Sequence, residues 1–511
     1  MSSQPFSLER VRELASAQRV IPLIRTLFSG SETPLSVFEK LAADKPGSFL
    51  LESAEHGVWA RYSFVGVNAR GFLAKRTGES VTWNSSSGAG ALPDGSSDLP
   101  KDALAALEVL HKAWNSDNRP DDFDELPPLV NGLVGLLGWD VIREIEHLPN
   151  VPEADFAAPE MGMSVFQDLV ILDHKTDSLL LVANIFVTDG ADIDALYADG
   201  LARLASLQDG ITKPSPVFLA NLDLQTDLNF EPRIERQDFL DAVEKSKHYV
   251  RIGDVFQVVL SQRFDVELSA TPLEVYRVLR SLNPSPYMYL LNFSDEDGDY
   301  SVVGASPESL VQVKNRHAVT HPIAGSRPRG ATLDADNELT ETLLADAKER
   351  AEHLMLVDLA RNDLLKVCQS DSVAVTEFMQ VHKYSHIMHL VSTVEGDLRA
   401  DQTAVDAFRA TFPAGTLSGA PKPRALEIID ELEPANRGIY GGVVGYFDFA
   451  GNADLAITIR TAFIRDGVAH VQAGAGIVLD SDPASEHQET ISKASASLRA
   501  VTAANAMKII R

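Results

Sequence analysis

The sequence is poor in cysteine and in long apolar segments. Its single cysteine, Cys368, excludes an internal disulfide and any zinc or redox site built on paired cysteines. Apolar segments such as Leu179–Val187 and Leu129–Trp139 are shorter than the roughly 18 to 20 residues that a membrane-spanning helix needs. The first residues contain no basic segment followed by an apolar one, so we expect a cytoplasmic protein without an export signal.

Positive charge is also scarce. The chain has 45 Lys and Arg against 73 Asp and Glu, which gives a formal net charge of −28. Nucleic acids and anionic membranes bind to concentrated Lys and Arg, so we expect neither of them as a partner. An anionic ligand would have to meet local positive charge or a bound cation.

Apolar residues, in contrast, are plentiful enough for a large core. The chain has 511 residues, of which 45% are hydrophobic, and this length allows two or three domains. The hydrophobic pattern loosens between 207 and 233, where Lys213-Pro214-Ser215-Pro216 interrupts it. We therefore predict an N-terminal region at 1–206 and a C-terminal region at 234–511.

Hydrophobic periodicity predicts the main elements of both regions. Helical spacing predicts helices at Asp102–Ser116, Arg236–Ile252 and Glu338–Asp363. Alternation and hairpin signals predict strands at Gly162–Asp173, Ser178–Thr188, Val255–Glu267, Gly442–Phe449, Ala453–Arg465 and Val468–Leu479. A final helix begins near Pro483, with Ser485 as N-cap and Gln488 completing a capping box.

Two helices carry paired glutamates. Glu349 and Glu352 are three residues apart on one predicted helix, and Glu486 and Glu489 are three apart on the last one. If all four faced one cleft, they would be stable only when protonated or bridged by a hard cation such as Mg²⁺. Acidic pairs at this spacing are also common on solvated helix faces, and the charge pattern alone leaves both interpretations open.

Cations and small residues stand near these glutamates. Lys493 follows Glu489 by four residues, and Arg460 ends a strand whose alternate positions are small, which leaves room for a ligand. Gly474 and Gly476 flank Ala475 and would let backbone N–H groups approach an oxyanion. A surface arginine and an ordinary bulge are the plain alternatives.

Several long motifs occur in one order and resemble the chorismate-utilising enzymes. The resemblance is dense over 236–500 and looser before it. The motifs are Pro322–Gly330 (PIAGSRPRG), Glu349–Asp363 (ERAEHLMLVDLARND), Pro413–Lys422 (PAGTLSGAPK), Gly438–Gly442 (GIYGG), Gln472–Gly476 (QAGAG) and Glu486–Glu489 (EHQE).

The resemblance implies a fold and a set of site residues. The implied fold is α+β, with antiparallel β-sheets packed as a sandwich and helices outside. Glu352 and Glu489 would bind Mg²⁺, with Glu349 and Glu486 around it through water, and the metal would hold the ring carboxylate of chorismate. The implied substrate-binding residues are Gly325, Ser326, Tyr440, Arg460, Gly474, Ala475, Gly476 and Lys493, and the implied active-site threonine is Thr416.

Within this family the chain most resembles the large subunits that make anthranilate. Isochorismate and salicylate synthases place a lysine where this chain has Gln257, and aminodeoxychorismate synthases commonly place one where it has Ala324. The resemblance therefore implies attack of ammonia at C2 of chorismate and loss of pyruvate. It assigns Glu308 as general acid for the leaving hydroxyl and His389 to the elimination of pyruvate.

The resemblance also implies partners. Cys368 does not lie in a Gly-x-Cys-x-Gly turn, so ammonia would come from a separate glutamine amidotransferase subunit. The segments Leu50–Ser53 and Asn283–Met288 match a feedback site for L-tryptophan. The residues expected there are Leu51, Ser53, Arg61, Pro286, Tyr287 and Met288.

Two other interpretations stay open at this point. Aminodeoxychorismate synthase component I has the same scaffold and can keep a tryptophan pocket, but it places nitrogen at C4. A degenerate subunit that senses tryptophan or serves as a scaffold is the non-enzymatic alternative. It is disfavoured because every matched metal and substrate position carries a competent residue.

Overall fold

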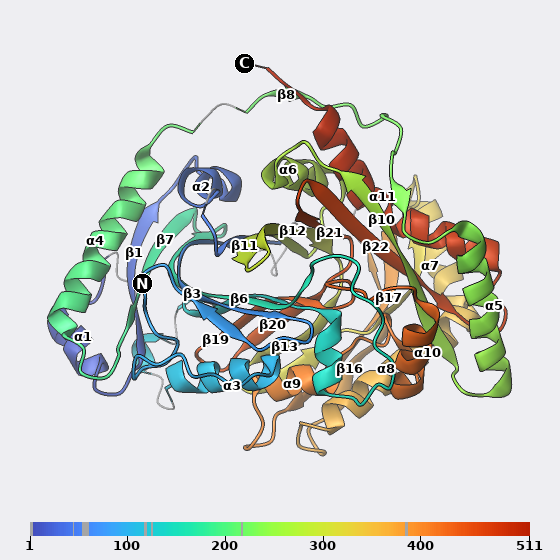
Figure 1. Cartoon of the computed structure of the whole chain (residues 1–511), viewed down its shortest axis with the longest axis horizontal. Coiled ribbons are helices and arrows are strands. Elements are labelled where there is room, and N and C mark those ends of the chain that lie inside the picture. Colours follow the sequence, from blue (N-terminus) through green and yellow to red (C-terminus); the bar gives the residue numbers. More distant parts are fainter. Residues whose placement is uncertain are drawn as a thin grey trace.

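The structure of the chain is a computed structural model. It describes residues 4–43, 45–53, 61–116, 120–123, 126–215, 218–383 and 387–510. Strands from both parts of the sequence fill the centre of the molecule and most helices lie around its outside (Figure 1). This is the predicted α+β architecture of antiparallel sheets with outer helices, which is therefore confirmed.

The helices are distributed along the whole described chain. They are α1 (Leu8–Leu14), α2 (Pro34–Leu41), α3 (Ala103–Trp114), α4 (Ile193–Thr212), α5 (Arg236–Ile252), α6 (Pro272–Leu282), α7 (Leu333–Ala345), α8 (Ala347–Leu365), α9 (Ala404–Thr411), α10 (Lys422–Leu432) and α11 (Pro483–Ala506), with 3-10 turns at Asp121–Phe123 and Trp139–Glu144.

The strands of the N-terminal region are long and mostly buried. They are β1 (Val20–Phe28), β2 (Ser48–Glu52), β3 (Tyr62–Arg76), β4 (Thr82–Asn84), β5 (Gly132–Leu137), β6 (Pro159–Asp173) and β7 (Ser178–Phe186), followed by the short β8 (Ala220–Asn221) and β9 (Glu231–Pro232).

The C-terminal region supplies the remaining strands. They are β10 (Gln257–Glu267), β11 (Tyr287–Asp295), β12 (Gly298–Ser306), β13 (Ser309–Lys314), β14 (His317–Thr320), β15 (Ile323–Pro328), β16 (Ala374–Lys383), β17 (Ile387–Asp397), β18 (Gly419–Ala420), β19 (Val443–Asp448), β20 (Ala453–Ile457), β21 (Thr461–Arg465), β22 (Val468–Ile477) and β23 (Lys508–Ile509).

Antiparallel pairing links these strands into two runs that share the long strand β6. One run is β1-β7-β6-β3-β2-β11-β12-β21-β22-β10, and the other is β6-β5-β19-β20-β13-β14-β17, with β15 and β16 also paired to β17. Strands that precede residue 207 pair with strands that follow residue 233 at two places, β2 with β11 and β5 with β19. Both parts of the sequence therefore build the same sheets.

The chain passes from one run to the other at two neighbouring corners. Pro307 and Glu308 connect β12 to β13, and Thr458, Ile459 and Arg460 connect β20 to β21. The backbone N–H of Ile457 donates to the carbonyl of Glu308 at 2.9 Å, so the corners adjoin. Strands that switch sheets make the corners of sandwiches, and here they bring Glu308 and Arg460 together.

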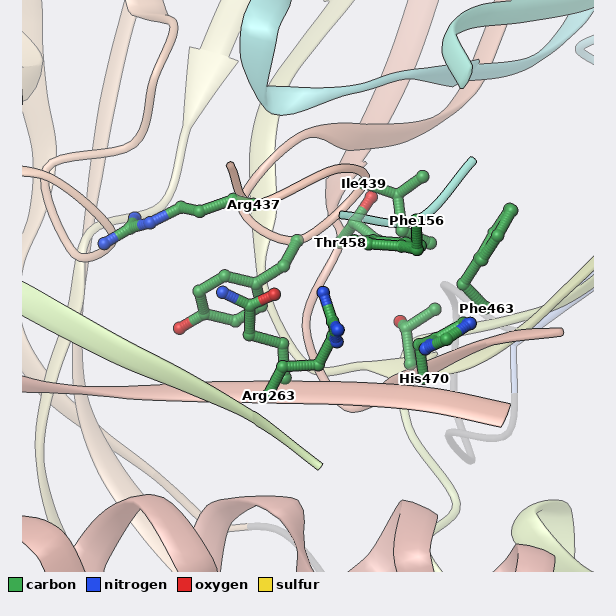
Figure 2. Close-up of a pocket in the computed structure, with 10 residues that line it drawn as sticks. Phe156, Arg263, Arg437, Ile439, Thr458, Phe463 and His470 are labelled. Atoms are coloured by element: carbon green, nitrogen blue, oxygen red, sulfur yellow. The ribbon is translucent and has the colours of Figure 1, made fainter. Parts of the chain in front are cut away.

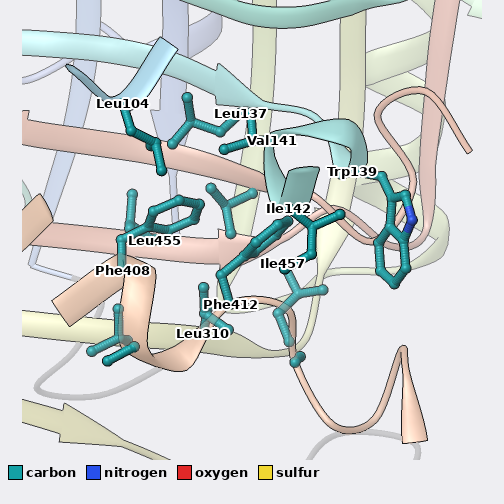
Figure 3. Close-up of a cluster of buried hydrophobic side chains, with 14 of the residues drawn as sticks. Leu104, Leu137, Trp139, Val141, Ile142, Leu310, Phe408, Phe412, Leu455 and Ile457 are labelled. Carbon is teal, nitrogen blue, oxygen red and sulfur yellow. The ribbon is translucent and has the colours of Figure 1, made fainter. Parts of the chain in front are cut away.

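Large apolar side chains fasten helices α3 and α9 onto the second run of strands. Leu104 of α3 and Phe408 of α9 lie in one buried cluster with Leu310 of β13 and Leu455 of β20 (Figure 3). The rings of Phe408 and Phe412 stack with their centroids 4.8 Å apart. This packing fixes the chain just before the 412–421 loop, which carries Thr416.

Most predicted elements occur in the structure. Helices α3 and α5 and strands β6, β7, β10, β19 and β22 lie within about two or three residues of their predicted limits. Predicted strand Ala453–Arg465 is wrong, because it breaks at Arg460, whose φ of 54° is incompatible with an extended strand.

Two helix predictions also need correction. The helix expected at Glu338–Asp363 is two helices, because Asp346 leaves the helical conformation and its carboxylate accepts from the N–H groups of Lys348 and Glu349. The N-cap of α11 is Asp482 rather than Ser485, and Asp482 accepts from the N–H of Ser485. Both aspartates satisfy N–H groups that the first turn of a helix leaves without partners.

Candidate active site

Glu308 lies at the first sheet corner, where burial favours the uncharged form of its carboxyl group. Burial raises the pKa of its carboxyl group to about 7, although a hydrogen bond from Thr416 and the charge of Lys493 oppose the shift. The hydroxyl of Thr416 donates to Oε1 of Glu308 at 2.9 Å. A carboxyl with a pKa near neutrality can hold and release a proton under physiological conditions, which suits a general acid.

Arg460 occupies the second corner. Its φ of 54° is unusual for a residue with a side chain. Burial lowers the pKa of its guanidinium, and within the described residues this group forms no hydrogen bond or ion pair. A partly buried cation without a partner is unfavourable, so this position is suited to an anionic ligand.

Of the two paired glutamates on each acidic helix, one forms an ion pair. Glu349 of α8 accepts from Arg327 at 3.2 Å, and Glu489 of α11 pairs with Lys493 at 2.7 Å. The Glu489 side chain is 48% exposed. Both carboxylates are therefore engaged in ion pairs, and neither is enclosed in the way of a buried metal ligand.

The other carboxylate of each helix is in a less favourable environment for its charge. Burial and, second, the charge of Glu349 raise the pKa of Glu352. Burial and the charge of Glu489 raise the pKa of Glu486, against a hydrogen bond from Ser481. Two helices distant in sequence thus present partly buried carboxylates whose negative charge is not fully compensated.

Lysine side chains connect these helices electrostatically. The charge of Lys493 lowers the pKa of Glu308, Glu352 and Glu486, and Lys348 acts in the same direction on the last two. Charges act over short distances in a protein at physiological salt. The structure therefore places Glu308 and the carboxylates of α8 and α11 within electrostatic range of the same lysine.

The glutamates of α8 and α11 offer carboxylate oxygens that could bind a metal ion. Among the described side chains, no group of three or more His, Cys, Asp or Glu is placed to hold a metal. Mg²⁺ needs fewer, because it usually takes one or two carboxylates and fills its other positions with water and ligand oxygens. Oxygen donors with uncompensated negative charge fit such a hard cation.

His389 faces the same place from strand β17. Its Nδ1 donates to the carbonyl of Gly325 at 3.3 Å, which leaves the lone pair on Nε2. Burial lowers the pKa of the imidazole, and the charge of Arg460 acts in the same direction. Ser326 lies directly opposite His389 in the β15–β17 ladder. His389 is therefore uncharged near neutral pH and able to accept a proton.

Glycines let the backbone and side chains of this site approach closely. Gly325 has a φ of 67°, and a Cβ there would lie 3.0 Å from Oε2 of Glu349. A Cβ on Gly474 would lie 2.8 Å from the hydroxyl of Tyr440, and one on Gly476 would lie 2.4 Å from Nε2 of Gln257. Side chains at these positions would clash with Glu349, Tyr440 and Gln257 in their present positions.

Strand β22 carries the rest of the predicted substrate wall. Lys493 donates to the carbonyl of Gly474 at 3.1 Å, and Ala475 is fully buried opposite Leu260 of β10. The charges of Glu308 and Arg460 both act on the Tyr440 hydroxyl, and burial raises its pKa. Tyr440, Gly474 and Lys493 of the predicted substrate set thus adjoin one another, and the charges of Glu308 and Arg460 act on the same group.

The predicted inhibitor residues lie on another part of the same sheets. Strands β2 and β11 pair with Glu52 opposite Met288, so the two predicted segments adjoin. The hydroxyl of Ser53 is buried and has no hydrogen-bond partner within the described chain. Arg61 pairs with Asp173 at 2.7 Å, and Pro286 and Leu51 are partly buried.

Two residues of these regions were not identified from the sequence as side chains that make contacts. Nε2 of Gln257 donates to Oε1 of Glu352 at 3.4 Å. Asp454 accepts from the hydroxyl of Tyr287 at 3.0 Å, and burial raises its pKa to about 6. The sequence distinguishes Gln257 only because isochorismate and salicylate synthases have a lysine at that position. No local sequence signal identifies Asp454.

Tyr440 is one of the residues that line a small cavity. Arg263, Arg437, Thr458 and His470 are among the residues that line it (Figure 2). Its volume of about 10 Å³ is the space for about one water molecule. It is too small for a six-membered ring with two carboxylates, so this cavity is not by itself the candidate substrate site.

Comparisons with known proteins agree with this arrangement. The family model described as chorismate binding enzyme matches residues 75–499. The chain is 50% identical to anthranilate synthase component 1 of Arthrobacter globiformis over 98% of this chain and 93% of that protein. It is 47% identical to the protein of the same name from Mycobacterium tuberculosis strain H37Rv over 98% and 96%.

Solved structures give the same result. Anthranilate synthase component I from Streptococcus pneumoniae TIGR4 superposes with a TM-score of 0.75 and 36% identity, covering 92% of this chain and 99% of that one. The menaquinone-specific isochorismate synthase of Escherichia coli shares the fold, with a TM-score of 0.69 and 18% identity over 97% and 98%.

Membrane insertion by a helix finds no support in the described residues. None of the helices within those ranges combines the length and the apolar composition that crossing a bilayer requires.

Proposed function

The chain belongs to the chorismate binding enzyme family, and we propose that it is the large subunit of an anthranilate synthase. It is a chorismate-utilising lyase. In the proposed reaction, ammonia adds to C2 of chorismate as the C4 hydroxyl leaves, and loss of pyruvate then gives anthranilate. Relatives named anthranilate synthase component 1 match the chain over 97% or 98% of its length.

The observation that carries this proposal is the pair of groups at the sheet corners. Arg460 is a partly buried cation without a partner among the described residues, and Glu308 is a carboxyl group with a pKa of about 7. The first can bind a carboxylate of the substrate and the second can protonate a leaving hydroxyl. Lys493 lies close enough to influence Glu308 and adds a second cation.

A magnesium ion fits the carboxylates of α8 and α11. We propose that Glu352 and Glu489 would hold it directly, with Glu349 and Glu486 around it through water. Ion pairs now occupy Glu349 and Glu489, so Arg327 and Lys493 would have to share them. Bound Mg²⁺ would supply a positive charge that holds and polarises the ring carboxylate of chorismate.

The protein's own groups account for the proton transfers. Glu308 would give its proton to the C4 hydroxyl, and the Thr416 hydroxyl would stabilise the carboxylate that results. Neutral His389, oriented by its bond to the carbonyl of Gly325, would accept the proton from C2 as the bond to the enolpyruvyl oxygen breaks. The Gly474 and Gly476 backbone, Ser326 and Tyr440 would position the ring and its side chain.

The nucleophile would come from another protein. Burial raises the pKa of Cys368 to about 11, so its thiol is not the nucleophile of a glutaminase. We propose a glutamine amidotransferase subunit that delivers ammonia and, in agreement with the sequence, a cytoplasmic location for the complex. Free ammonium should replace that subunit in a test with the purified chain.

We further propose that L-tryptophan inhibits the enzyme at strands β2 and β11. The unpartnered Ser53 hydroxyl offers a hydrogen bond to an amino acid there. Tyr287 pairs with Ser306, two residues before Glu308, so a ligand against Tyr287 is only one strand from the first corner. Movement of β12 would then change the position of the general acid.

One experiment tests the function directly. Purified chain is incubated with chorismate, MgCl₂ and ammonium, and products are separated and identified by mass and fluorescence. We expect anthranilate, dependent on Mg²⁺ and reduced by L-tryptophan. Formation of 4-amino-4-deoxychorismate instead would identify the runner-up enzyme, and the absence of any chorismate conversion would reject both.

A further inference from the structure

The last residues of two sequence motifs have no role in the chemistry described above. Lys422 ends the segment PAGTLSGAPK, and Asp363 ends the segment ERAEHLMLVDLARND. In the structure Nζ of Lys422 lies 2.6 Å from Oδ2 of Asp363, and their side chains are only 9% and 7% exposed. Neither group contacts the predicted substrate or metal residues, so the ion pair needs a different explanation.

Lys422 also joins the two ends of a loop. It is the first residue of α10, and its ammonium donates to the carbonyl of Thr411, the last residue of α9, at 2.9 Å. The loop 412–421 lies between them and carries Thr416. One buried cation therefore connects both ends of the Thr416 loop to helix α8.

The same face of α8 connects this loop to the glutamates. Glu352, Leu356, Leu359 and Asp363 follow one another at steps of three and four residues, which places them on one side of the helix. A Cβ on Gly415 would lie 2.2 Å from Cδ2 of Leu359, so the loop packs directly on this side. Rotation or sliding of α8 would change the position of Glu352 relative to Thr416.

A buried ion pair is a poor source of stability but can fix one arrangement. Removing two charges from water offsets much of their attraction, and apolar replacements of both partners often leave stability unchanged. Register is a better-supported use of such pairs. Asp363 has Lys366 as a second cation at 3.0 Å, and Arg437 donates to the carbonyl of Leu417 at 2.7 Å. Fold and loop thus keep other anchors without Lys422.

We propose that the Lys422–Asp363 pair is a positioning device that sets helix α8 and the Thr416 loop in register, so that Glu352 and Glu308 act on one bound ligand. The proposal rests on the proposed function, since it assigns Glu352 and Glu308 to a common site. Lys422 and Asp363 act through Thr416 and α8 and do not contact the substrate.

The test uses the full chain with Lys422→Met and with the double variant Lys422→Met/Asp363→Leu. We expect kcat with ammonium to fall about 10- to 100-fold in both, because small misplacements of catalytic groups have effects of this size. KM for chorismate should change less than about threefold, since Arg460 and Lys493 are untouched. Amide hydrogen exchange in 412–421 should become faster while the melting temperature of the double variant stays near that of the wild type.

A matched control replaces another buried pair. Arg465 and Asp295 lie 2.7 Å apart with 4% and 2% exposure and join β21 to β11. The variant Arg465→Met/Asp295→Leu should leave exchange in 412–421 unchanged. Wild-type kcat together with wild-type exchange in both Lys422 variants would overturn the proposal. If the wild type itself forms no anthranilate, the proposed function fails, and the exchange comparison still decides whether the pair orders the loop.

Discussion

The sheet corners and the β2–β11 strand pair differ in how their charges are compensated. At the corners, Arg460 has no partner within the described residues, and burial and like charges raise the pKa of Glu352 and Glu486. At the β2–β11 strand pair, the carboxylate of Glu52 accepts hydrogen bonds from Arg280 at 3.1 Å and from Tyr276 at 2.6 Å.

The difference shows what each region is suited to bind. Uncompensated charges of both signs at the corners favour binding of an anion together with a cation. Such ligands supply the opposite charges that the protein itself does not place there. Among the described residues, the groups without a partner at the β2–β11 strand pair include the neutral hydroxyls of Ser48, at the start of β2, and Ser53, just after its end. That region is therefore suited to a ligand held by apolar contacts and a few hydrogen bonds.

The largest expected effect comes from removing a charge at the corners. Glu489→Gln keeps the size of the side chain but loses a proposed metal ligand, and kcat should fall on the order of 1,000-fold without unfolding. Steady-state rates over a range of MgCl₂, with circular dichroism, measure this. The control Glu244→Gln removes an exposed helical glutamate paired with Lys247 at 3.2 Å and should have no effect. Unchanged turnover in Glu489→Gln would remove this residue from the metal site.

His389→Met should separate the two halves of the reaction. Without the imidazole that accepts the C2 proton, elimination of pyruvate should slow by about 100-fold, while amination continues. An aminated intermediate that still carries the enolpyruvyl group should therefore accumulate, as followed by chromatography and mass spectrometry. Anthranilate and intermediate in wild-type proportions would contradict the role given to His389.

Ser53→Ala tests the proposed inhibitor site at the β2–β11 strand pair and leaves the sheet corners unchanged. Loss of one hydrogen bond to a bound amino acid should raise the tryptophan concentration for half inhibition by roughly five- to tenfold, with uninhibited activity unchanged. Ser48→Ala is a close control, because Ser48 lies at the other end of β2 and its hydroxyl is also buried without a partner in the described chain. Equal sensitivity of all three proteins would exclude Ser53 from the inhibitor site.

Sequence patterns predicted regular elements better than they predicted breaks. Helix α5 was predicted at its observed limits because periodicity covers all of it. The break at Asp346 could have been inferred, since Asp346 followed by Glu349 at N3 resembles a capping signature. The cap at Asp482 had a signal too, because Pro483 is favoured at the first helical position.

Other features depend on tertiary structure and have no local signal. The positive φ of Arg460 follows from the chain changing sheets, which its neighbours in sequence do not encode. The glutamates were identified from spacing and resemblance, but their different partners, Arg327 for Glu349 and Lys493 for Glu489, come from separate elements. The ion pair of Asp363 with Lys422 spans 59 residues of sequence for the same reason.

The smallest expected effect is a shift in the pH dependence of Thr416→Val. The Thr416 hydroxyl stabilises the ionised form of Glu308, so its removal should raise the pKa of Glu308 above about 7. A general acid must be protonated, and activity that depends on it falls as pH rises through its pKa. The alkaline limb of kcat/KM should therefore move to higher pH by roughly 0.5 to 1 unit, about the worth of one hydrogen bond.

The direction of that shift distinguishes the general acid from a group that must be ionised. If Glu308 acted as a carboxylate, the same substitution would move an acidic limb upward and reduce activity near pH 7. Thr411→Val is the matched control, because the Thr411 hydroxyl donates to the carbonyl of Ala407 at 2.9 Å, within its own helix. Rates measured from pH 6 to 9 in constant ionic strength, with both variants at saturating Mg²⁺, decide between the two roles of Glu308.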